Sequence, residues 1–314
     1  MQTFCTIITA SHLPLAKVLF ASLQRHSPGS SLQVLVVDKE LTSGTSNFTI
    51  HSLPSLSNTA HFKEIEKKYA HANPDHFRWS LKPVFINYLL QTDFTKVIFA
   101  DPDIYFIGNY DMLFNELDEN NVLLTPHWAN TDPLQNEDSL LTIMKDGLYN
   151  AGFVAANRAG SAAMDTWAGL CQYRTEPLAS LGLFVDQKYL DILPVQFDKV
   201  KVIKHQGCNL ASWNIDTCKR QLFDGKLYIN GKFEPVFIHF AKDTIVNILN
   251  RNDVLLQPYL DEYMAELKKE GFDLLKNIDD LEPVRFRSLT YSIKHKLRIR
   301  TRFKRFLFRL AQKL

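Results

Sequence analysis

The feature that most constrains the fold is an alternation of β-branched runs with helix-like segments over the first hundred residues. Residues 4–9, 32–37 and 96–100 have the composition of buried strands. Residues 14–25 and 81–89 between them carry apolar side chains at helical spacing. Strand–helix–strand units place parallel strands side by side, because the helix returns the chain to the same edge of the sheet. We therefore expect an α/β fold with a mainly parallel sheet flanked by helices.

The rest of the chain continues this pattern less regularly. Strands are expected at 121–125, 151–156 and 235–240, the last of these as the final strand. Asp132, Pro133 and Gly147 supply the cap, the first-turn proline and the terminating glycine of a helix. Residues 40–60 are ambiguous, the stretch after Gly207 is irregular, and 258–270 is an amphipathic helix outside the sheet. We predict a catalytic domain at 1–245, a helical extension at 246–284 and a separate tail at 285–314.

The tail is distinguished by its charge. Residues 285–314 contain eleven Lys or Arg and no Asp or Glu, whereas residues 1–284 carry a net charge of −9. Apolar residues recur in the tail at spacings of three and four, which predicts a basic amphipathic helix suited to an anionic membrane surface. A helix packed on the acidic body, or an RNA-binding arm, are the alternatives. The aliphatic face argues against RNA, because nucleic-acid arms are usually polar.

The four cysteines, Cys5, Cys171, Cys208 and Cys218, show no Cys-x-x-Cys spacing, so we expect reduced thiols and no zinc site. No signal-peptide pattern precedes the first strand, and no run of about 18 apolar residues occurs. These observations predict a cytoplasmic protein, peripheral on the inner face of the membrane if the tail binds lipid.

The sharpest local motif is Asp101-x-Asp103, directly after an apolar strand. Ligands of parallel sheets sit at the carboxyl ends of the strands, and two carboxylates there can share a hard divalent cation. The alternative is a pair of loop-capping carboxylates. The motif belongs to an ordered series of short segments: ASHLP from Ala10, RWSLKP from Arg78, VIFADPDI from Val97, YNAGF from Tyr149, VDQKYL from Val185 and FIHF from Phe237.

This ordered series resembles the GT-A glycosyltransferases, and most closely family 8, which includes glycogenin and bacterial lipooligosaccharide galactosyltransferases. The resemblance spans roughly residues 3–243 and implies the GT-A (Rossmann-like) fold. It implies that Asp101, Asp103 and His239 hold Mn²⁺ or Mg²⁺ on the donor diphosphate. After His239 the family usually continues with Gly and Lys-Pro-Trp, whereas this chain has Ala241-Lys242-Asp243, so the phosphate-binding loop is altered.

The resemblance also assigns the donor site. Thr9, Ala10, Ser11 and His12 match the region that binds the nucleoside, and the end of a first strand is independently where nucleotides sit in open α/β sheets. Ser11 has a second interpretation, as a helix cap. Lys82 matches a residue against the donor diphosphate or sugar, or is a solvated helix lysine. Lys242 is a second phosphate candidate.

The sugar-transfer residues follow in the same way. Asn150 with Ala151, and the pair Asp186 and Gln187, match residues that line the donor sugar, and the pair supplies the group facing the anomeric carbon. Asp186 has an alternative role as a helix N-cap. Aromatic and amide side chains suit a sugar acceptor, because sugars stack on rings and pair with amides; buried core Trp is the alternative. The acceptor candidates are His127, Trp128, Asn209 and Trp213.

Together these residues predict a metal-dependent glycosyltransferase that moves a hexose from a nucleotide-diphosphate sugar, UDP-hexose by default, to a glycan or glycolipid acceptor. Surface polysaccharide or lipooligosaccharide synthesis is the expected setting, with retention of anomeric configuration and no nucleic-acid partner. Two alternatives remain. One is a haloacid-dehalogenase-type phosphatase with Asp101 as nucleophile, and the other is a non-catalytic GT-A-like module that binds membrane or glycan.

Overall fold

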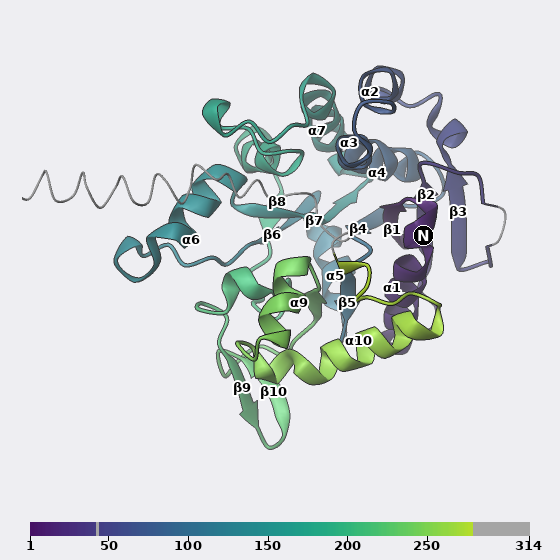
Figure 1. Cartoon of the computed structure of the whole chain (residues 1–314). Helices are drawn as coiled ribbons and strands as arrows, with labels where there is room; N and C mark the ends of the chain where they lie inside the picture. The colour runs from purple at the N-terminus through teal and green to yellow at the C-terminus, as the bar shows by residue number, and fades with distance from the viewer. Residues whose placement is uncertain (42–43, 279–314) are drawn as a thin grey trace, which may run out of the picture. The chain divides into compact units, whose positions relative to one another are not determined.

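The computed structural model describes residues 1–41 and 44–278, and residues 1–277 form a compact unit. Its centre is a seven-stranded sheet in the order β3-β2-β1-β4-β7-β6-β8 (Figure 1). The strands of this sheet are β1 (Gln2–Ile8), β2 (Leu32–Val36), β3 (Phe48–Ser52), β4 (Lys96–Ala100), β6 (Val122–Pro126), β7 (Tyr149–Asn157) and β8 (Val200–Val202). The basic tail predicted at 285–314 lies outside the described residues.

The sheet is mixed and mainly parallel, as expected from the sequence. Strands β1, β2, β3 and β4 pair in parallel, and so do β6 and β8. Strand β7 alone runs antiparallel to both of its neighbours, β4 and β6. Because β1 and β4 are adjacent and parallel, their carboxyl ends lie at the same edge, where Thr9 and Asp101 follow them.

Helices cover both faces of the sheet. Alternate residues of each strand point to opposite faces, so Val97 and Phe99 lie in one core and Ile98 and Ala100 in the other. The first core is closed by α2 (Phe62–Tyr69), α3 (Pro74–Ser80), α4 (Lys82–Leu90) and α7 (Ser161–Tyr173), and the second by α1 (Leu13–His26) and α5 (Asp111–Glu119). The remaining α-helices are α6 (Pro133–Asp146), α8 (Leu193–Gln196), α9 (Lys242–Leu249) and α10 (Gln257–Lys269).

The helix predicted between Asp132 and Gly147 is confirmed. Asp132 caps α6 by accepting the backbone N–H of Leu134, and Gly147 terminates the helix with a φ of 109°. The ambiguous stretch 40–60 contains the edge strand β3. All four cysteines are free and buried. Among the described residues, no helix is long and apolar enough to cross a membrane.

The last strand expected at residues 235–240 is confirmed. The segment does form a strand, β11 (Phe237–His239), but β11 does not join the main sheet. It pairs antiparallel with β5 (Ile104–Phe106) in a separate two-stranded sheet, because the chain turns at Asp101-Pro102-Asp103 and presents β5 as a free edge. This pairing brings His239 opposite Ile104, one residue after Asp103.

A hairpin that the sequence analysis missed lies in the irregular stretch after Gly207. Its strands are β9 (Arg220–Phe223) and β10 (Lys226–Ile229). The Asp224-Gly225 pair between them was the signal that could have found it, since Asp-Gly between two short strands is a strong hairpin pattern.

Helix α10 packs against the two-stranded sheet of β5 and β11. Tyr263 is fully buried and its ring stacks on Phe240 at 4.6 Å and contacts Tyr105 edge-on at 5.3 Å. Ion pairs join α10 to α1, including Arg25 with Glu262 at 2.7 Å. Helix α10 thus packs against the residues next to Asp103 and His239 in sequence.

Candidate functional site

The site is centred on Asp101, Asp103 and His239. One carboxylate or imidazole atom from each lies within 4.8 Å of the others. Asp101 and Asp103 flank the turn between β4 and β5, and His239 ends β11. Two carboxylates and one imidazole form a donor set that suits a divalent cation such as Mn²⁺ or Mg²⁺. The residues therefore fit the metal that the resemblance implies.

The three side chains form a charged and largely buried group. His239 is 7% exposed, and its Nε2 lies 3.2 Å from Oδ1 of Asp103. Burial disfavours the charge of either residue, but their attraction dominates: it raises the pKa of His239 and lowers the pKa of Asp103. An ionised carboxylate is the form that binds a cation.

Gly152 leaves the space in which this cluster sits. A Cβ at Gly152 would lie 2.6 Å from Cε1 of His239, 2.8 Å from Oδ2 of Asp101 and 2.9 Å from Oδ1 of Asn150. Asn150 accepts the backbone N–H of Gly152 and contacts Nδ1 of His239 through its Nδ2 at 2.9 Å. Strand β7 thus supplies both the space beside the cluster and a partner for the histidine.

Lys82 is a buried lysine held by two carboxylates. It is 5% exposed, and its Nζ lies 3.2 Å from Oδ1 of Asp101 and 3.4 Å from Oδ2 of Asp186. It also donates to the carbonyl of Ala151 at 3.2 Å. Burial disfavours its charge, but the two carboxylates prevail and raise its pKa. The alternative of a solvated helix lysine is wrong, because Lys82 is buried in the first turn of α4 and pairs with two carboxylates.

Asp186 and Gln187 differ in their surroundings. Asp186 is 1% exposed; burial raises its pKa to about 6, with Lys82 opposing the shift. Asp186 stands at the N-cap position of the following 3₁₀ helix, Gln187–Ile192, as the capping alternative expects, but its side chain makes no cap hydrogen bond. Gln187 is partly exposed, accepts the N–H of Ala151 and donates to the carbonyl of Asp146, which fixes its amide at both ends.

The backbone before this pair is strained. Val185 has a φ of 43°, a left-handed conformation that a β-branched residue rarely adopts. Such conformations cost on the order of 1–3 kcal/mol and cluster at functional sites, where the surrounding structure imposes them. The strain at Val185 therefore marks the segment that presents Asp186 and Gln187.

The predicted nucleoside-binding residues follow β1. Residues Ala10–His12 form a short 3₁₀ turn, and Thr9 Oγ1 lies 2.6 Å from Nδ1 of His12 and 3.0 Å from Oγ of Ser11. The α1 cap is His12, with no side-chain cap bond, so Ser11 does not cap α1. Lys242 is partly exposed at the start of α9, three residues after His239.

The acceptor candidates fall into two groups. The Trp213 ring contacts His239 edge-on at 5.3 Å and His127 at 5.7 Å, so Trp213 links His127 to the cluster of Asp101, Asp103 and His239. Asn209 accepts from Asn150 at 2.8 Å. The Trp128 ring instead lies beneath Nζ of Lys204 at 5.8 Å.

Two site residues were missed at the sequence level. Asp38 follows β2 and accepts the backbone N–H of Ala10 at 2.7 Å, so it shapes the turn that is predicted to bind the nucleoside. A carboxylate directly after a predicted parallel strand was the available signal. Gly152 lies within the YNAGF motif but was assigned no role, because only the fold reveals what its missing side chain leaves room for.

A buried arginine orders the loop that carries the acceptor candidates. Arg220 donates to the carbonyls of Ala211, Asn214 and Cys218. Its Nε lies 3.0 Å from Oδ2 of Asp253, and both side chains are at most 5% exposed. Asn214 in turn donates to the carbonyls of Asn209 and His127. Nothing in the local sequence of Arg220 indicates this arrangement.

Known proteins with similar sequence or fold give the following comparisons. No family model matches the chain. The chain is 24% identical over 252 residues to the uncharacterized protein YfnF of Bacillus subtilis, covering 79% of this chain and 83% of that protein. The solved structure of mouse xyloside xylosyltransferase 1 is similar at 15% identity and a TM-score of 0.46, covering 78% of this chain and 99% of that one. The galactosyltransferase LgtC, solved with donor and acceptor sugar analogs, is similar at 12% identity and a TM-score of 0.42, covering 66% of this chain and 74% of that one.

Proposed function

We propose that the chain is a metal-dependent glycosyltransferase that moves a hexose from a nucleotide-diphosphate sugar, a UDP-hexose, to a glycan or glycolipid acceptor. The observation that carries the proposal is the cluster of Asp101, Asp103 and His239 at the carboxyl edge of a mainly parallel sheet. Beside it lie a buried lysine and the Asp186–Gln187 pair. This combination offers a cation site, a fixed positive charge and sugar-directed polar groups in one place.

Each group has a distinct part in this proposal. Asp101, Asp103 and His239 would hold Mn²⁺ or Mg²⁺, which when bound offsets the charge on the departing diphosphate. Lys82 neutralises Asp101 and Asp186 and presents its ammonium beside them. The turn from Thr9 to His12, with Asp38, binds the nucleoside, and Lys242 adds a charge for the phosphates.

We assign roles at the donor sugar according to how exposed each side chain is. Gln187 is partly exposed and held at both ends of its amide, so it faces the donor sugar and supports a retaining transfer. Asp186 is buried and paired with Lys82, so its effect on the reaction passes through that lysine. Asn150 with Ala151 completes the sugar pocket. The acceptor in this proposal is bound by His127, Asn209 and Trp213, with Trp128 at the edge of this group.

In this proposal, the basic segment 285–314 binds the protein to a membrane surface. Its eleven positive charges and recurrent apolar residues suit an anionic bilayer, at about 1 kcal/mol per basic residue near the surface. The acceptor would then be membrane-borne, at the inner face of the membrane. Surface polysaccharide or lipooligosaccharide synthesis fits such an acceptor.

The test measures hydrolysis and transfer from UDP-, GDP- and CMP-hexoses with and without Mn²⁺, together with Mn²⁺ binding by calorimetry. We expect metal-dependent turnover of a UDP-hexose that Asp103→Asn abolishes along with tight Mn²⁺ binding. Asp165→Asn is the matched control, because the Asp165 side chain is 54% exposed and lies on α7. Absence of turnover and of nucleotide binding across the panel would overturn the proposal.

A further inference from the structure

The β9–β10 hairpin has a rigid shape set by two Asx-Gly turns. Asp224 and Gly225 have φ values of 49° and 75°, and Asn230 and Gly231 have values of 53° and 65°. Consecutive positive φ values are those of the type I′ turn, whose twist matches that of the flanking strands. The second turn folds the chain back so that Phe233 bridges to Ile229. A short, well-defined platform results.

One face of this platform carries aromatic and polar side chains together. Phe223 pairs with Lys226 and Gln221 with Tyr228, so these four side chains share a face of the hairpin. The rings of Phe223 and Tyr228 lie 6.0 Å apart at 66°. Leu222 points to the opposite face, because neighbouring residues of a strand alternate.

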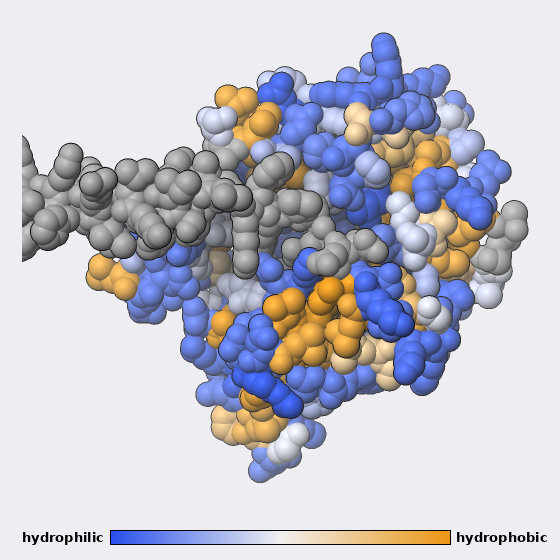
Figure 2. All heavy atoms as spheres, in the orientation of Figure 1, coloured by the Kyte–Doolittle hydropathy of each residue, from blue (hydrophilic) through white to orange (hydrophobic). Residues whose placement is uncertain are grey.

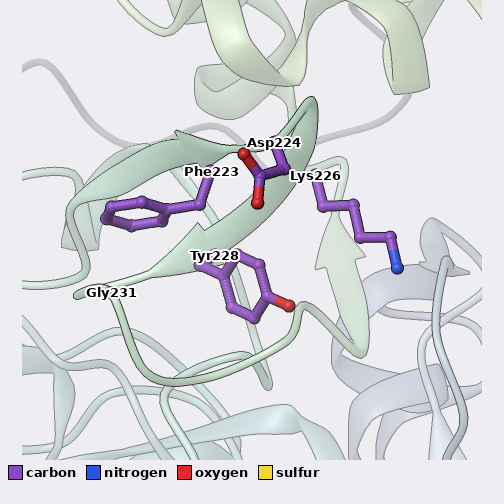
Figure 3. A pocket seen from close by; sticks show the side chains of 5 residues that line it. All are labelled: Phe223, Asp224, Lys226, Tyr228 and Gly231. Atoms are coloured by element: carbon purple, nitrogen blue, oxygen red, sulfur yellow. The ribbon is translucent and has the colours of Figure 1, made fainter.

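This face is hollowed. Phe223, Asp224, Lys226, Tyr228 and Gly231 line a pocket of about 380 Å³, in the size range of small-molecule sites. Figure 3 shows Phe223, Asp224 and Tyr228 gathered on one side, with Lys226 extending away from them. A Cβ at Gly231 would lie 3.6 Å from the Phe223 ring and 3.3 Å from Oε1 of Gln221, so this glycine lets both side chains lie close to the second turn.

The pocket combines ring faces with polar groups whose charges cancel. Asp224 contributes a negative charge and Lys226 a positive one, while Tyr228 adds a neutral hydroxyl. A bilayer or an apolar protein surface would desolvate these polar groups without giving them partners, which is costly. A neutral sugar offers hydroxyls to the polar groups and C–H faces to the rings. Apolar side chains at the hairpin are also visible in Figure 2, separate from a larger group over α9.

We propose that this face of the β9–β10 hairpin is a glycan-binding subsite, separate from the metal cluster, that holds a neutral hexose unit of the acceptor. The hairpin follows the loop that carries Asn209 and Trp213, and the chain continues from it into the strand that ends at His239. The inference rests on the proposed function for the identity of the glycan as acceptor, while binding itself is measured without it.

The experiment measures binding of maltohexaose, cellohexaose and β-1,4-galactohexaose to the full chain, by saturation-transfer NMR and calorimetry, without donor or metal. We expect at least one of these oligosaccharides to bind, and Phe223→Ala and Tyr228→Ala each to weaken that binding at least fivefold. Leu222→Ala is the matched control, because Leu222 is 55% exposed and Phe223 51%, on the same strand but on opposite faces. Circular dichroism verifies that every variant is folded.

Two results would overturn the subsite. One is that none of the three oligosaccharides binds; the other is that binding survives both ring substitutions or falls equally in Leu222→Ala. Asp103→Asn separates this inference from the proposed function, because it removes the metal cluster and leaves the hairpin intact. Hairpin-dependent binding without any nucleotide-sugar turnover would uphold the subsite and reject the transferase, and turnover without such binding would do the reverse.

Discussion

Nδ2 of Asn150 lies 2.9 Å from Nδ1 of His239, on the side of the imidazole ring opposite the nitrogen that approaches Asp103. The same amide accepts the backbone N–H of Gly152 through its oxygen and donates to Asn209. Asn150 therefore fixes the orientation of His239, a predicted metal ligand, and joins it to Asn209, a predicted acceptor residue.

Removing this support is expected to weaken metal binding. Residues that orient metal ligands typically contribute about 10–100-fold to affinity. We expect Asn150→Ala to lower Mn²⁺ affinity by about that factor in calorimetry, with Asn250→Ala, at an exposed helix end, unchanged. Equal affinities for the native chain and Asn150→Ala would show that the contact with His239 has no orienting effect.

Adding a single methyl group at Gly152 is expected to disrupt the cluster. Its Cβ would overlap Cε1 of His239 and Oδ2 of Asp101, both under 3 Å away. We expect Gly152→Ala to abolish Mn²⁺ binding and metal-dependent turnover, while the chain still folds. Gly29→Ala is the control, since a Cβ there meets no atom within 4 Å. Normal Mn²⁺ affinity in Gly152→Ala would mean that the cluster is not the metal site.

Loss of the Lys82 ammonium is expected to destabilise the fold. Lys82→Met would leave Asp186 buried without its counter-ion, and breaking a buried ion pair from one side costs about 3–5 kcal/mol. We expect a loss of this order in urea unfolding at pH 7. Lys68→Met is the control, because the Lys68 side chain makes its contacts in exposed surroundings. Equal losses for the two variants would contradict a buried pairing.

Asp186 is expected to make the stability of the chain depend on pH. Burial raises its pKa in the folded state to about 6, above the ordinary value of 3.8, despite the opposing effect of Lys82. The folded state then binds the proton more tightly, so this group makes the free energy of unfolding fall as pH rises from about 4 to 6. We expect Asp186→Asn to gain stability relative to the native chain across that interval in urea unfolding. A constant difference would refute the raised pKa.

The Arg220–Asp253 pair is expected to stabilise the loop that carries the acceptor candidates Asn209 and Trp213. Arg220→Ala leaves Asp253 buried and unpaired and frees three loop carbonyls, so we expect a loss of about 3–5 kcal/mol in stability. The double variant Arg220→Met with Asp253→Leu should recover part of the stability but not the loop contacts. In that variant we expect a raised KM for the acceptor with donor hydrolysis unchanged. An unaltered acceptor KM would make the pair purely structural.

The tail is expected to act independently of the catalytic residues. Removal of residues 285–314 should abolish sedimentation with anionic liposomes and leave metal-dependent donor hydrolysis largely intact, because the eleven charges are confined to that segment. Neutral liposomes are the control. A truncated chain that fails to fold would favour a helix packed on the body instead.

The sequence by itself determined several central elements and which residues stand at the ends of those strands. Periodicity and capping patterns identify β1, β2, β4 and α6 because these depend on local propensity and on burial of one face. The Asp101-x-Asp103 motif is equally local, since a carboxylate after a buried strand is visible without knowing any neighbour. The hairpin at Asp224-Gly225 was also readable in this way, although it was missed.

Only the tertiary structure decided which of these residues meet. His239 reaches Asp103 because β11 pairs with β5 instead of joining the main sheet, and pairing between distant strands leaves no local signal. Three features depend on residues that are about twenty to more than one hundred positions apart: the burial of Lys82 between Asp101 and Asp186, the space at Gly152 beside Asp101 and His239, and the pairing of Arg220 with Asp253. Their energies come from desolvation and close approach, which are properties of the packed chain and not of any segment within it.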